Sequence, residues 1–326
     1  MPKARPVAQG HRQIEGSDYT ETFAPVVRYD SVRVFLAISA CLRLTVRQMD
    51  VNMAFLYSPI DDAVTVYACQ PLQFVDPAHP DYVWQLKGAM YGLKQAPLLW
   101  NQYIHTTLTK LGFHRHEGEY GLYFKRIPAG QVVVALCVDD LLIAASNETI
   151  VGNVKRQLSR IYSMKDLGPA RKFLGMNVKQ TPRSISITLA DYIFAAAASS
   201  EVPLHGQIHT PLSPSTNFQD ECSLPLEDVT PYQAIVGQLL FIANTSHPDI
   251  AYSMSLLSRF PELLDRYTSV QLTVYSSTCI PPALTGLCIV PDLRSRLSST
   301  PMLRTALQPI SFTLHGGTSC RWQGVL

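Results

Sequence analysis

The stretch Ala135–Ser146, ALCVDDLLIAAS, places two adjacent carboxylates, Asp139 and Asp140, between two apolar runs. Burying a charge is costly unless a partner compensates it, so two like charges side by side need an explanation. The flanking runs, Val132–Val138 and Leu141–Ala145, are joined only by this pair. Two short apolar runs with a two-residue joint predict a β-hairpin, with the aspartates at its tip.

A third carboxylate, Asp50, lies near the end of another predicted strand, Thr45–Val51. Carboxylates from neighbouring strands would make the all-oxygen site that Mg²⁺ prefers. Two such ions can activate a 3′-hydroxyl and stabilise a leaving pyrophosphate. The alternative is a solvated turn, which is the commoner role of an Asp pair in a hairpin. The surrounding sequence has to decide between these two interpretations.

Helix and strand patterns alternate with turn signals up to Phe260. Start and stop residues place the helices. We expect a helix capped by Ser31 that runs to Leu42, one from Pro97 to Gly112, one capped by Asn147 with the apolar stripe Ile150, Val154, Leu158 and Ile161, and two at Thr230–Asn244 and Pro248–Phe260. After Phe260 no period is found, and Asp292 is the only carboxylate beyond Asp265.

Composition limits the class of protein. The chain has 326 residues, is 47% hydrophobic and 16% charged, and carries a formal net charge of +2, which is too small to identify a partner. Its seven cysteines form no C-x-x-C pair, which argues against a zinc ribbon or a disulfide scaffold. We therefore expect an intracellular protein, cytoplasmic or nuclear, because the polar, basic N-terminus is no secretory signal. No apolar stretch is long enough to predict a membrane span.

A local excess of basic residues favours nucleic acid. Eight basic residues and one acid, Asp166, lie between Val151 and Arg183. Such an excess can neutralise phosphates and release counterions. The candidate contacts are Lys155, Arg156, Lys165 and Lys172. The alternative is an ordinary solvated helix face.

Six blocks of sequence, in order, resemble the reverse transcriptase domain of copia-type retrotransposon polyproteins. They cover Lys3 to Phe260, about four-fifths of the chain. The blocks are KARPVAQGHRQIEGSDYTETFAPVVR (Lys3–Arg28), QMDVNMAFL around Asp50, LKGAMYGLKQAPLLW (Leu86–Trp100), CVDDLLI in place of the YVDD box, MKDLGPARKFLGM (Met164–Met176) and YQAIVGQLLFIANTSHPDIAYSMSLLSRF (Tyr232–Phe260).

The resemblance implies an α+β fold, the right-hand polymerase fold of palm, fingers and thumb, with an antiparallel palm sheet and a catalytic β-hairpin. Fingers and palm would occupy residues 1–180, and a thumb or connection-like region residues 181–262. It also implies an RNA-directed DNA polymerase that uses an RNA or DNA template, a primer and dNTPs. Asp50, Asp139 and Asp140 would hold two Mg²⁺ ions, or Mn²⁺, as catalytic and metal-binding residues.

The same resemblance assigns substrate-binding residues. Phe55 falls at the sugar-gate position, where a bulky ring would clash with a ribose 2′-hydroxyl, although spacing alone favours a core aromatic. Tyr91, Gly92 and Gln95 lie in the template and nucleotide motif, where Gly92 would let the backbone approach a base pair.

Two further pairs are assigned from the ends of this region. Lys3 and Arg5 resemble fingers residues that meet the incoming triphosphate, although basic residues near a terminus are usually solvated. Phe173 and Gly175 match the segment that grips the primer end, although an ordinary core strand would look the same.

Several departures favour other outcomes. Cys137 replaces the family's usual Tyr. Residues 263–326 look like a degenerate tail, with an RNase H-like remnant near residues 310–322, so no RNase H activity is expected. A frame disruption between about Pro261 and Gln308 would explain this tail. The alternatives to an active polymerase are a catalytically inactive retrotransposon remnant and a non-enzymatic nucleic-acid-binding module; the oligomeric state stays open.

Overall fold

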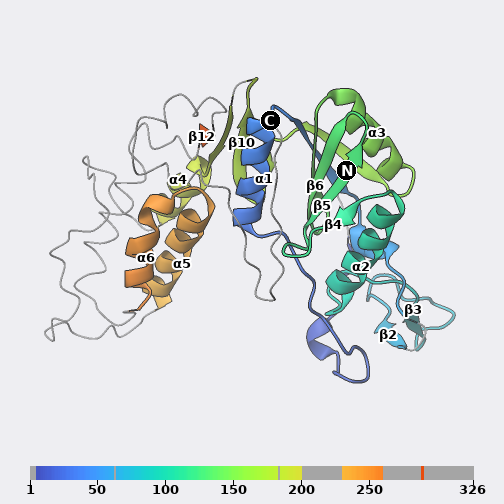
Figure 1. The fold of residues 1–326 in the computed structure, drawn as a ribbon. Coiled ribbons are helices and arrows are strands. Elements are labelled where there is room, and N and C mark those ends of the chain that lie inside the picture. The colour runs from blue at the N-terminus through green and yellow to red at the C-terminus, as the bar shows by residue number, and fades with distance from the viewer. Residues whose placement is uncertain (1–4, 62–63, 183, 200–229, 260–287, 290–326) are drawn as a thin grey trace, which may run out of the picture.

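The computed structural model describes residues 5–61, 64–182, 184–199, 230–259 and 288–289. It combines helices with a six-stranded sheet, a four-stranded sheet and a two-stranded ribbon (Figure 1). This mixture, with its antiparallel pairing, confirms the α+β class. The expected remnant at 310–322 lies outside the described residues, as does Lys3. No helix in the described part of the chain is long and apolar enough to cross a bilayer.

The six-stranded sheet contains the acidic motifs. Its strands follow the order β4-β5-β6-β7-β1-β8, and all the pairs are antiparallel. Their bounds are β1 Thr45–Val51, β4 His114–Arg115, β5 Leu122–Ile127, β6 Gly130–Cys137, β7 Asp140–Ala145 and β8 Met164–Pro169. The strand predicted at Thr45–Val51 is confirmed, and it lies between β7 and β8 inside the sheet.

Both faces of this sheet are covered, which explains its continuous apolar runs. One face packs against α2 (Ala96–Lys110) and α3 (Glu148–Ser159), and Leu141, Ile143 and Ala145 point into that core. The intervening Leu142 and Ala144 point to the other core, which includes α1 (Tyr29–Cys41). Strand β7 is therefore buried on alternate sides all along its apolar length.

The second sheet continues the core on the α1 side. Its order is β12-β11-β10-β9, with β9 Lys172–Phe173, β10 Met176–Gln180, β11 Ile185–Thr188 and β12 Cys288–Ile289. Helices α4 (Ala190–Ser199), α5 (Thr230–Thr245) and α6 (Ala251–Leu257) lie beyond it, and α1 lies between them and the large sheet (Figure 1). Because β10 pairs with β11, one sheet spans the expected domain boundary at residue 180.

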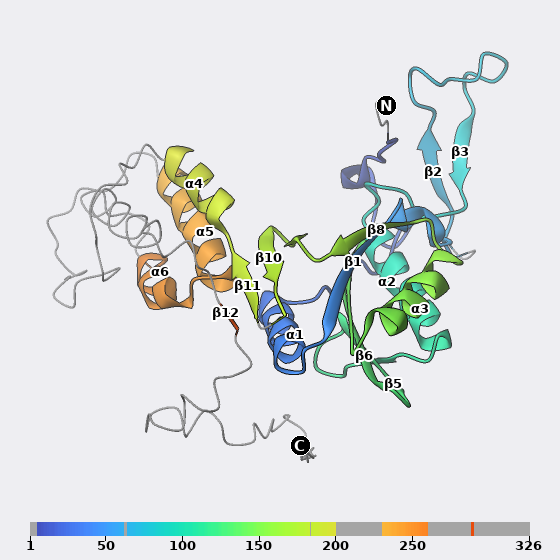
Figure 2. The same cartoon turned by 90° about the horizontal axis from the view of Figure 1, so that it is seen from above.

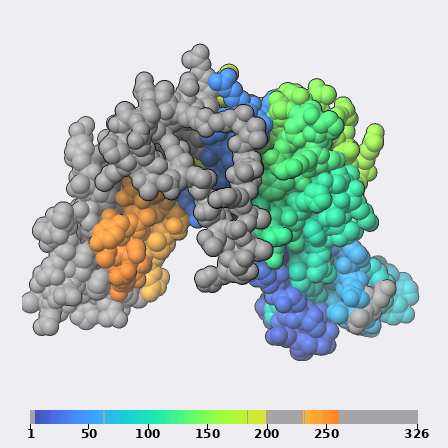
Figure 3. All heavy atoms as spheres, viewed as in Figure 1, coloured from blue at the N-terminus to red at the C-terminus, as the bar shows by residue number. Residues whose placement is uncertain are grey.

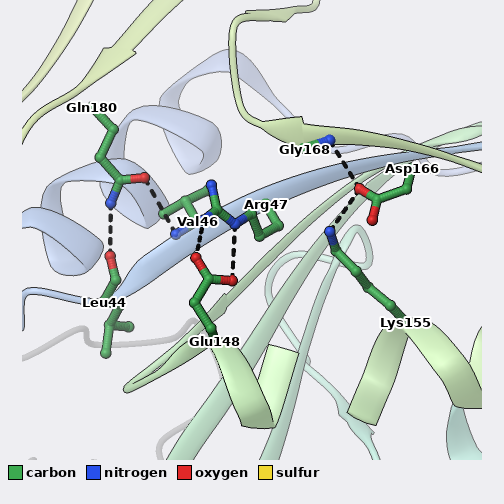
Figure 4. A network of polar contacts seen from close by, with 8 residues as sticks. All are labelled: Leu44, Val46, Arg47, Glu148, Lys155, Asp166, Gly168 and Gln180. Atoms are coloured by element: carbon green, nitrogen blue, oxygen red, sulfur yellow. Dashed lines mark hydrogen bonds and ion pairs between the residues drawn. The ribbon is translucent and has the colours of Figure 1, made fainter. Parts of the chain in front are cut away.

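Side-chain contacts join these layers around β1 (Figure 4). The Gln180 amide donates to the Leu44 carbonyl at 2.8 Å and accepts from the Val46 N–H at 3.3 Å, which fastens β10 to the start of β1. Arg47 pairs with Glu148 at the first turn of α3. Central strand β1 is thus fixed to α3 and to the second sheet.

The two-stranded ribbon, β2 (Val66–Cys69) and β3 (Val83–Leu86), projects away from the large sheet (Figure 2). The N-terminal segment, which includes the 3₁₀ turn η1 (Gly10–Arg12), lies at the lower end of the part of the molecule that contains the large sheet (Figure 3). A small core cluster of Ile60, Val66, Ala89, Leu93 and Ala96 supports this region.

Most helix predictions are confirmed, with specific corrections. Asn147 caps α3 by accepting from the Ile150 N–H at 3.0 Å. The buried stripe of α3 contains Val151, whereas Ile161 follows the helix and is exposed. The expected helix from Pro248 begins as a 3₁₀ turn, η3 (Pro248–Ile250), which continues into α6.

Ser31 does not cap α1. The helix begins at Tyr29, and the Ser31 hydroxyl donates to the Glu119 carboxylate instead. Glu119 also accepts from the Arg28 side chain at 3.0 Å and the Gly121 N–H at 3.3 Å. Burial raises the pKa of this carboxyl, but these hydrogen bonds outweigh burial and hold the pKa below its ordinary value. Glu119 therefore ties the start of α1 to the loop before β5.

We expect Glu119→Gln to destabilise the fold by about 1–3 kcal/mol at neutral pH, because Arg28, Ser31 and Gly121 lose a buried, charged acceptor. A carboxyl whose pKa is lower in the folded state stabilises the fold at pH values above its ordinary pKa, and this stabilisation is lost as the pH falls through the folded-state pKa. In urea unfolding, the difference in free energy of unfolding between wild type and Glu119→Gln should therefore become smaller in acid. The control is Glu148→Gln, which removes an exposed carboxylate and should cost less than about 1 kcal/mol. Equal losses in both variants would contradict this assignment.

Candidate active site

The hairpin turn differs by one residue from the predicted one. Cys137 pairs with Asp140, so the two turn residues are Val138 and Asp139, and Asp140 is the first residue of β7. Val138 has a φ of +55°, which is unusual for a β-branched residue. Such conformations cost about 1–3 kcal/mol and cluster at functional sites. The turn thus places the two aspartates on a strained but defined backbone.

Strand pairing brings Asp50 to the same end of the sheet. Asp50 lies directly opposite Asp140 across β1 and β7, where facing side chains are close neighbours. The Val51 N–H donates to the Asp139 carbonyl at 2.8 Å, so the turn is bonded to β1 as well. On the other side of β1, Lys165 of β8 lies opposite Asp50. All three predicted catalytic carboxylates, Asp50, Asp139 and Asp140, therefore lie at the end of the sheet where β1 finishes and β7 begins, which we name the acidic edge.

These carboxylates repel one another. Burial raises the pKa of Asp139 and Asp140, and the charge of Asp50 raises both further. Arg5 partly opposes the shift at Asp139, and Gln48 opposes it at Asp140. Within the described residues, none of the three aspartates forms an ion pair. The site therefore holds excess negative charge.

This donor chemistry fits a hard divalent cation. Carboxylate oxygens are the ligands that Mg²⁺ prefers, and a cation would compensate the excess charge. In the described part of the chain, no three His, Cys, Asp or Glu groups already converge closely enough to chelate an ion. Mutual repulsion of the aspartates opposes such convergence. The residues that would hold Mg²⁺ remain Asp50, Asp139 and Asp140.

Gln48 was not predicted from the sequence. Its side-chain nitrogen donates to the Lys172 carbonyl at 2.9 Å and reaches the Asp140 carboxylate at 3.4 Å. The side chain is buried, so its amide needs partners. Gln48 and Asp50 are two residues apart and share one face of β1, which is the sequence signal that could have found it. Gln48 links the acidic edge to β9.

Three predicted substrate residues form a second cluster beside the aspartates. The Phe55 ring, in the 3₁₀ turn η2 (Ala54–Tyr57), meets the Tyr91 ring at 5.0 Å between centroids. The Arg5 guanidinium lies 5.2 Å from the centre of the Tyr91 ring. Burial raises the pKa of the Tyr91 phenol; Arg5 lowers it, and Asp139 and Asp50 raise it, so these groups lie within electrostatic reach. The structure thus brings Arg5, Phe55 and Tyr91 to the acidic edge.

Gly92 allows a close backbone contact within the protein. It has a φ of +90°, and a Cβ there would lie 2.0 Å from the Ala8 carbonyl oxygen. A Cβ on Gly10 would lie 2.0 Å from the Gly92 carbonyl oxygen, so the two glycines interlock. The adjacent Tyr91 carbonyl accepts from the Ala8 N–H at 2.7 Å. The approach of Gly92 to a base pair stays a prediction.

Gln95 is engaged with the N-terminal segment. It is buried, accepts from the Gln13 side chain at 2.9 Å and donates to the Asp18 carbonyl at 3.0 Å. Its amide therefore positions that segment as the structure stands. Contact with a nucleotide or template would need a further hydrogen-bonding position on this amide, and it stays a prediction.

The candidate nucleic-acid contacts differ in how free they are. Lys165 and Lys172 are exposed. Lys155 donates to Asp166 at 2.6 Å, as Figure 4 shows, and Arg156 bonds the Asn153 side chain. The first two are thus available to phosphates, whereas Lys155 already has a carboxylate partner.

The two residues of the predicted primer-gripping segment, Phe173 and Gly175, lie in different environments. Phe173 is only 1% exposed and belongs to the core that contains α1, which is the alternative interpretation given above. Gly175, with a φ of +82°, lies in the turn between β9 and β10. A Cβ there would approach the Phe241 ring of α5 at 3.4 Å.

Cys137 lies where the family usually has Tyr, and its side chain packs partly against the α1 core. Burial, Asp140 and Asp139 raise the pKa of this thiol to about 11. The group is therefore a neutral thiol near pH 7 and adds no charge beside the aspartates.

We expect Asp139→Asn to stabilise the metal-free fold at neutral pH by about 1 kcal/mol after solvent screening, or about 2–4 °C in melting temperature. A raised folded-state pKa means that the ionised Asp139 destabilises the fold, and acid relieves this cost. The gain should shrink as pH falls toward the carboxyl range, and Mg²⁺ should raise the melting temperature of wild type more than that of the variant. Scanning calorimetry with and without Mg²⁺ checks this, and a destabilised variant would contradict it.

The family description "Reverse transcriptase (RNA-dependent DNA polymerase)" matches residues 1–213. A transposon Ty5-1 protein of Saccharomyces cerevisiae is 53% identical over 213 residues, which cover 65% of this chain and 68% of that protein.

Plant polyproteins match a longer part of the chain. The retrovirus-related Pol polyprotein from transposon RE1 of Arabidopsis thaliana is 36% identical over 258 residues, 79% of this chain and 17% of the polyprotein. That from transposon TNT 1-94 of Nicotiana tabacum is 32% identical over 269 residues, 80% of this chain and 20% of the polyprotein. The chain therefore spans about a fifth of these polyproteins. With its family match covering more than half of its length, the chain belongs to the reverse transcriptase (RNA-dependent DNA polymerase) family.

Proposed function

We propose that the chain adds deoxynucleotides to a primer 3′-hydroxyl, directed by an RNA or DNA template. The observation that carries this proposal is the cluster of Asp50 on β1 with Asp139 and Asp140 at the neighbouring hairpin turn, in a member of the reverse transcriptase family. The Pol relatives support nucleic acid as the partner.

The layers support a right-hand arrangement. The six-stranded sheet with α2 and α3 would be the palm, because its edge carries the aspartates. The N-terminal segment and the β2–β3 ribbon would be the fingers. The second sheet with α4, α5 and α6 would be the thumb or connection-like region, which packs on the palm through α1.

The chemistry is an in-line displacement. The primer 3′-hydroxyl gives up its proton to water, its oxygen forms a bond to the α-phosphorus of the nucleotide, the α–β phosphoanhydride bond breaks, and pyrophosphate leaves. Two Mg²⁺ ions, when bound, would lower the pKa of the 3′-hydroxyl and neutralise the pyrophosphate. Asp50, Asp139 and Asp140 would hold those ions, with Gln48 orienting Asp140.

The residues beside the aspartates would bind the nucleotide. Arg5 would offer its guanidinium to the triphosphate, since Arg suits phosphate oxygens. The Phe55 and Tyr91 rings, in edge contact, would form the floor under the sugar. Lys165, opposite Asp50, and Lys172 would meet phosphates of the primer–template duplex.

Primer extension on poly-rA with oligo-dT and Mg²⁺ tests the proposal. We expect extension by wild type and a loss of at least about a hundredfold in Asp139→Asn and Asp140→Asn, because metal stabilisation is worth several kcal/mol. Glu148→Gln, an exposed carboxylate on α3, is the matched control and should keep its rate. A folded wild type that binds the duplex in a salt-dependent way without extending it would overturn polymerase activity in favour of a binding module.

A sugar gate at Phe55 predicts a change in nucleotide selectivity. Phe55→Val should raise kcat/KM for ribonucleotides relative to deoxynucleotides by about tenfold or more, because removing bulk relieves a clash with the 2′-hydroxyl. Single-nucleotide incorporation with dTTP and rUTP measures the ratio. Leu56→Ala, an exposed neighbour on the same turn, is the control. An unchanged ratio would leave Phe55 as a packing residue.

A further inference from the structure

Trp100 makes one directed contact with the acidic hairpin. It lies on α2 and is only 1% exposed. Its indole N–H donates to the Val138 carbonyl at 2.6 Å. Val138 is the first residue of the two-residue turn, and it directly precedes Asp139. A residue on a helix behind the sheet therefore holds the backbone of the turn.

The turn depends on such support. Val138 occupies a left-handed conformation that a β-branched residue adopts only when its surroundings enforce it. A two-residue turn also leaves its own carbonyls outside the strand ladder. Here the Asp139 carbonyl accepts from the Val51 N–H and the Val138 carbonyl accepts from Trp100, so each has one fixed partner.

Trp100 is itself held rigidly. Its ring lies 5.4 Å from that of Tyr162 and 6.4 Å from that of Tyr57, measured between centroids. The Tyr162 hydroxyl donates to Thr107 at 2.6 Å, and the Tyr57 hydroxyl accepts from the Ser163 N–H at 2.7 Å. This cluster leaves the indole little freedom to turn, so its N–H points at the carbonyl in a preorganised way.

We propose that Trp100 is a positioning residue, whose indole N–H fixes the left-handed turn at Val138 and thereby sets the direction of Asp139 and Asp140. The inference rests on the proposed function only for its effect on catalysis. Its effect on the turn can be measured without any activity. Trp100 touches no reacting atom, so it acts entirely through the backbone of the turn.

Trp100→Phe tests this by removing the N–H while keeping an aromatic ring. We expect kcat for nucleotide addition to fall about ten- to a hundredfold, as for small misplacements of catalytic groups. KM for dTTP and Kd for the primer duplex should change less than about twofold, because Trp100 is only 1% exposed and is out of reach of either ligand. Trp84→Phe is the matched control, since Trp84 makes no hydrogen bond through its indole N–H within the described residues.

Two readouts are independent of turnover. Mn²⁺ titration followed by electron paramagnetic resonance should show weaker binding in Trp100→Phe. Amide hydrogen exchange over Val138–Leu141 should become at least about tenfold faster, while exchange in α3 stays unchanged. If wild type extends no primer, the proposed function fails, and the exchange comparison still decides this inference.

A second background separates positioning from packing. Gly accepts a φ of +55° without strain, so Val138→Gly should need the indole bond less. In the Val138→Gly background, the fold loss of kcat caused by Trp100→Phe should be at least threefold smaller than in wild type. The change in amide hydrogen exchange at the turn should be smaller as well. A loss that is the same in both backgrounds, or wild-type exchange in Trp100→Phe, would overturn the proposal.

A closer isostere covers the case in which Trp100→Phe fails to fold. Benzothienylalanine replaces the indole N–H by sulfur and keeps the shape of the ring. The chain has three tryptophans, so it would be incorporated in a Trp84→Phe, Trp322→Phe background. Faster exchange at the turn in that protein supports the proposal, and unchanged exchange contradicts it.

Discussion

Repulsion between the carboxylates of the acidic edge, where strands β1 and β7 meet, is the constraint on which the rest of the structure depends. Strand β1 lies between β7 and β8, and its register sets Asp50 against Asp140. A shift of one residue would turn every side chain of β1 to the opposite face and disperse the acidic edge. The buried contacts that fix β1, including those of Gln180 and Gln48, are therefore also what keeps the carboxylates together.

Much of this arrangement was readable from local pattern. Strand Thr45–Val51, the two apolar runs of the hairpin and the Asn147 cap were predicted because each depends on neighbours in sequence. The one-residue error at the hairpin has a physical cause. Asp is a favoured turn residue, so both aspartates were placed at the tip of the hairpin. No feature of the sequence indicates that Val138 adopts the left-handed conformation there.

The contacts that sequence reasoning missed are long-range. Ser31 was predicted to cap a helix, but its hydroxyl donates a hydrogen bond to Glu119, which lies 88 residues away in sequence. Gln48 and Trp100 are ordinary polar and core residues until the fold brings them to Asp140 and Val138. Family resemblance named the residues that are expected to face substrate. It could not name residues such as Gln48 and Trp100 behind the sheet, because only the geometry of the fold brings them to the hairpin.

The interlocked glycines impose an order of events during synthesis. The segment that carries Arg5 is synthesised before its docking site, because Tyr91 and Gly92 follow more than eighty residues later in the chain. Loop closure of that length is slow compared with local helix formation. The segment around Arg5 therefore stays undocked until Gly92 has been made. A nascent chain held short of Gly92 would have its acidic hairpin still to come and no place to dock the segment around Arg5.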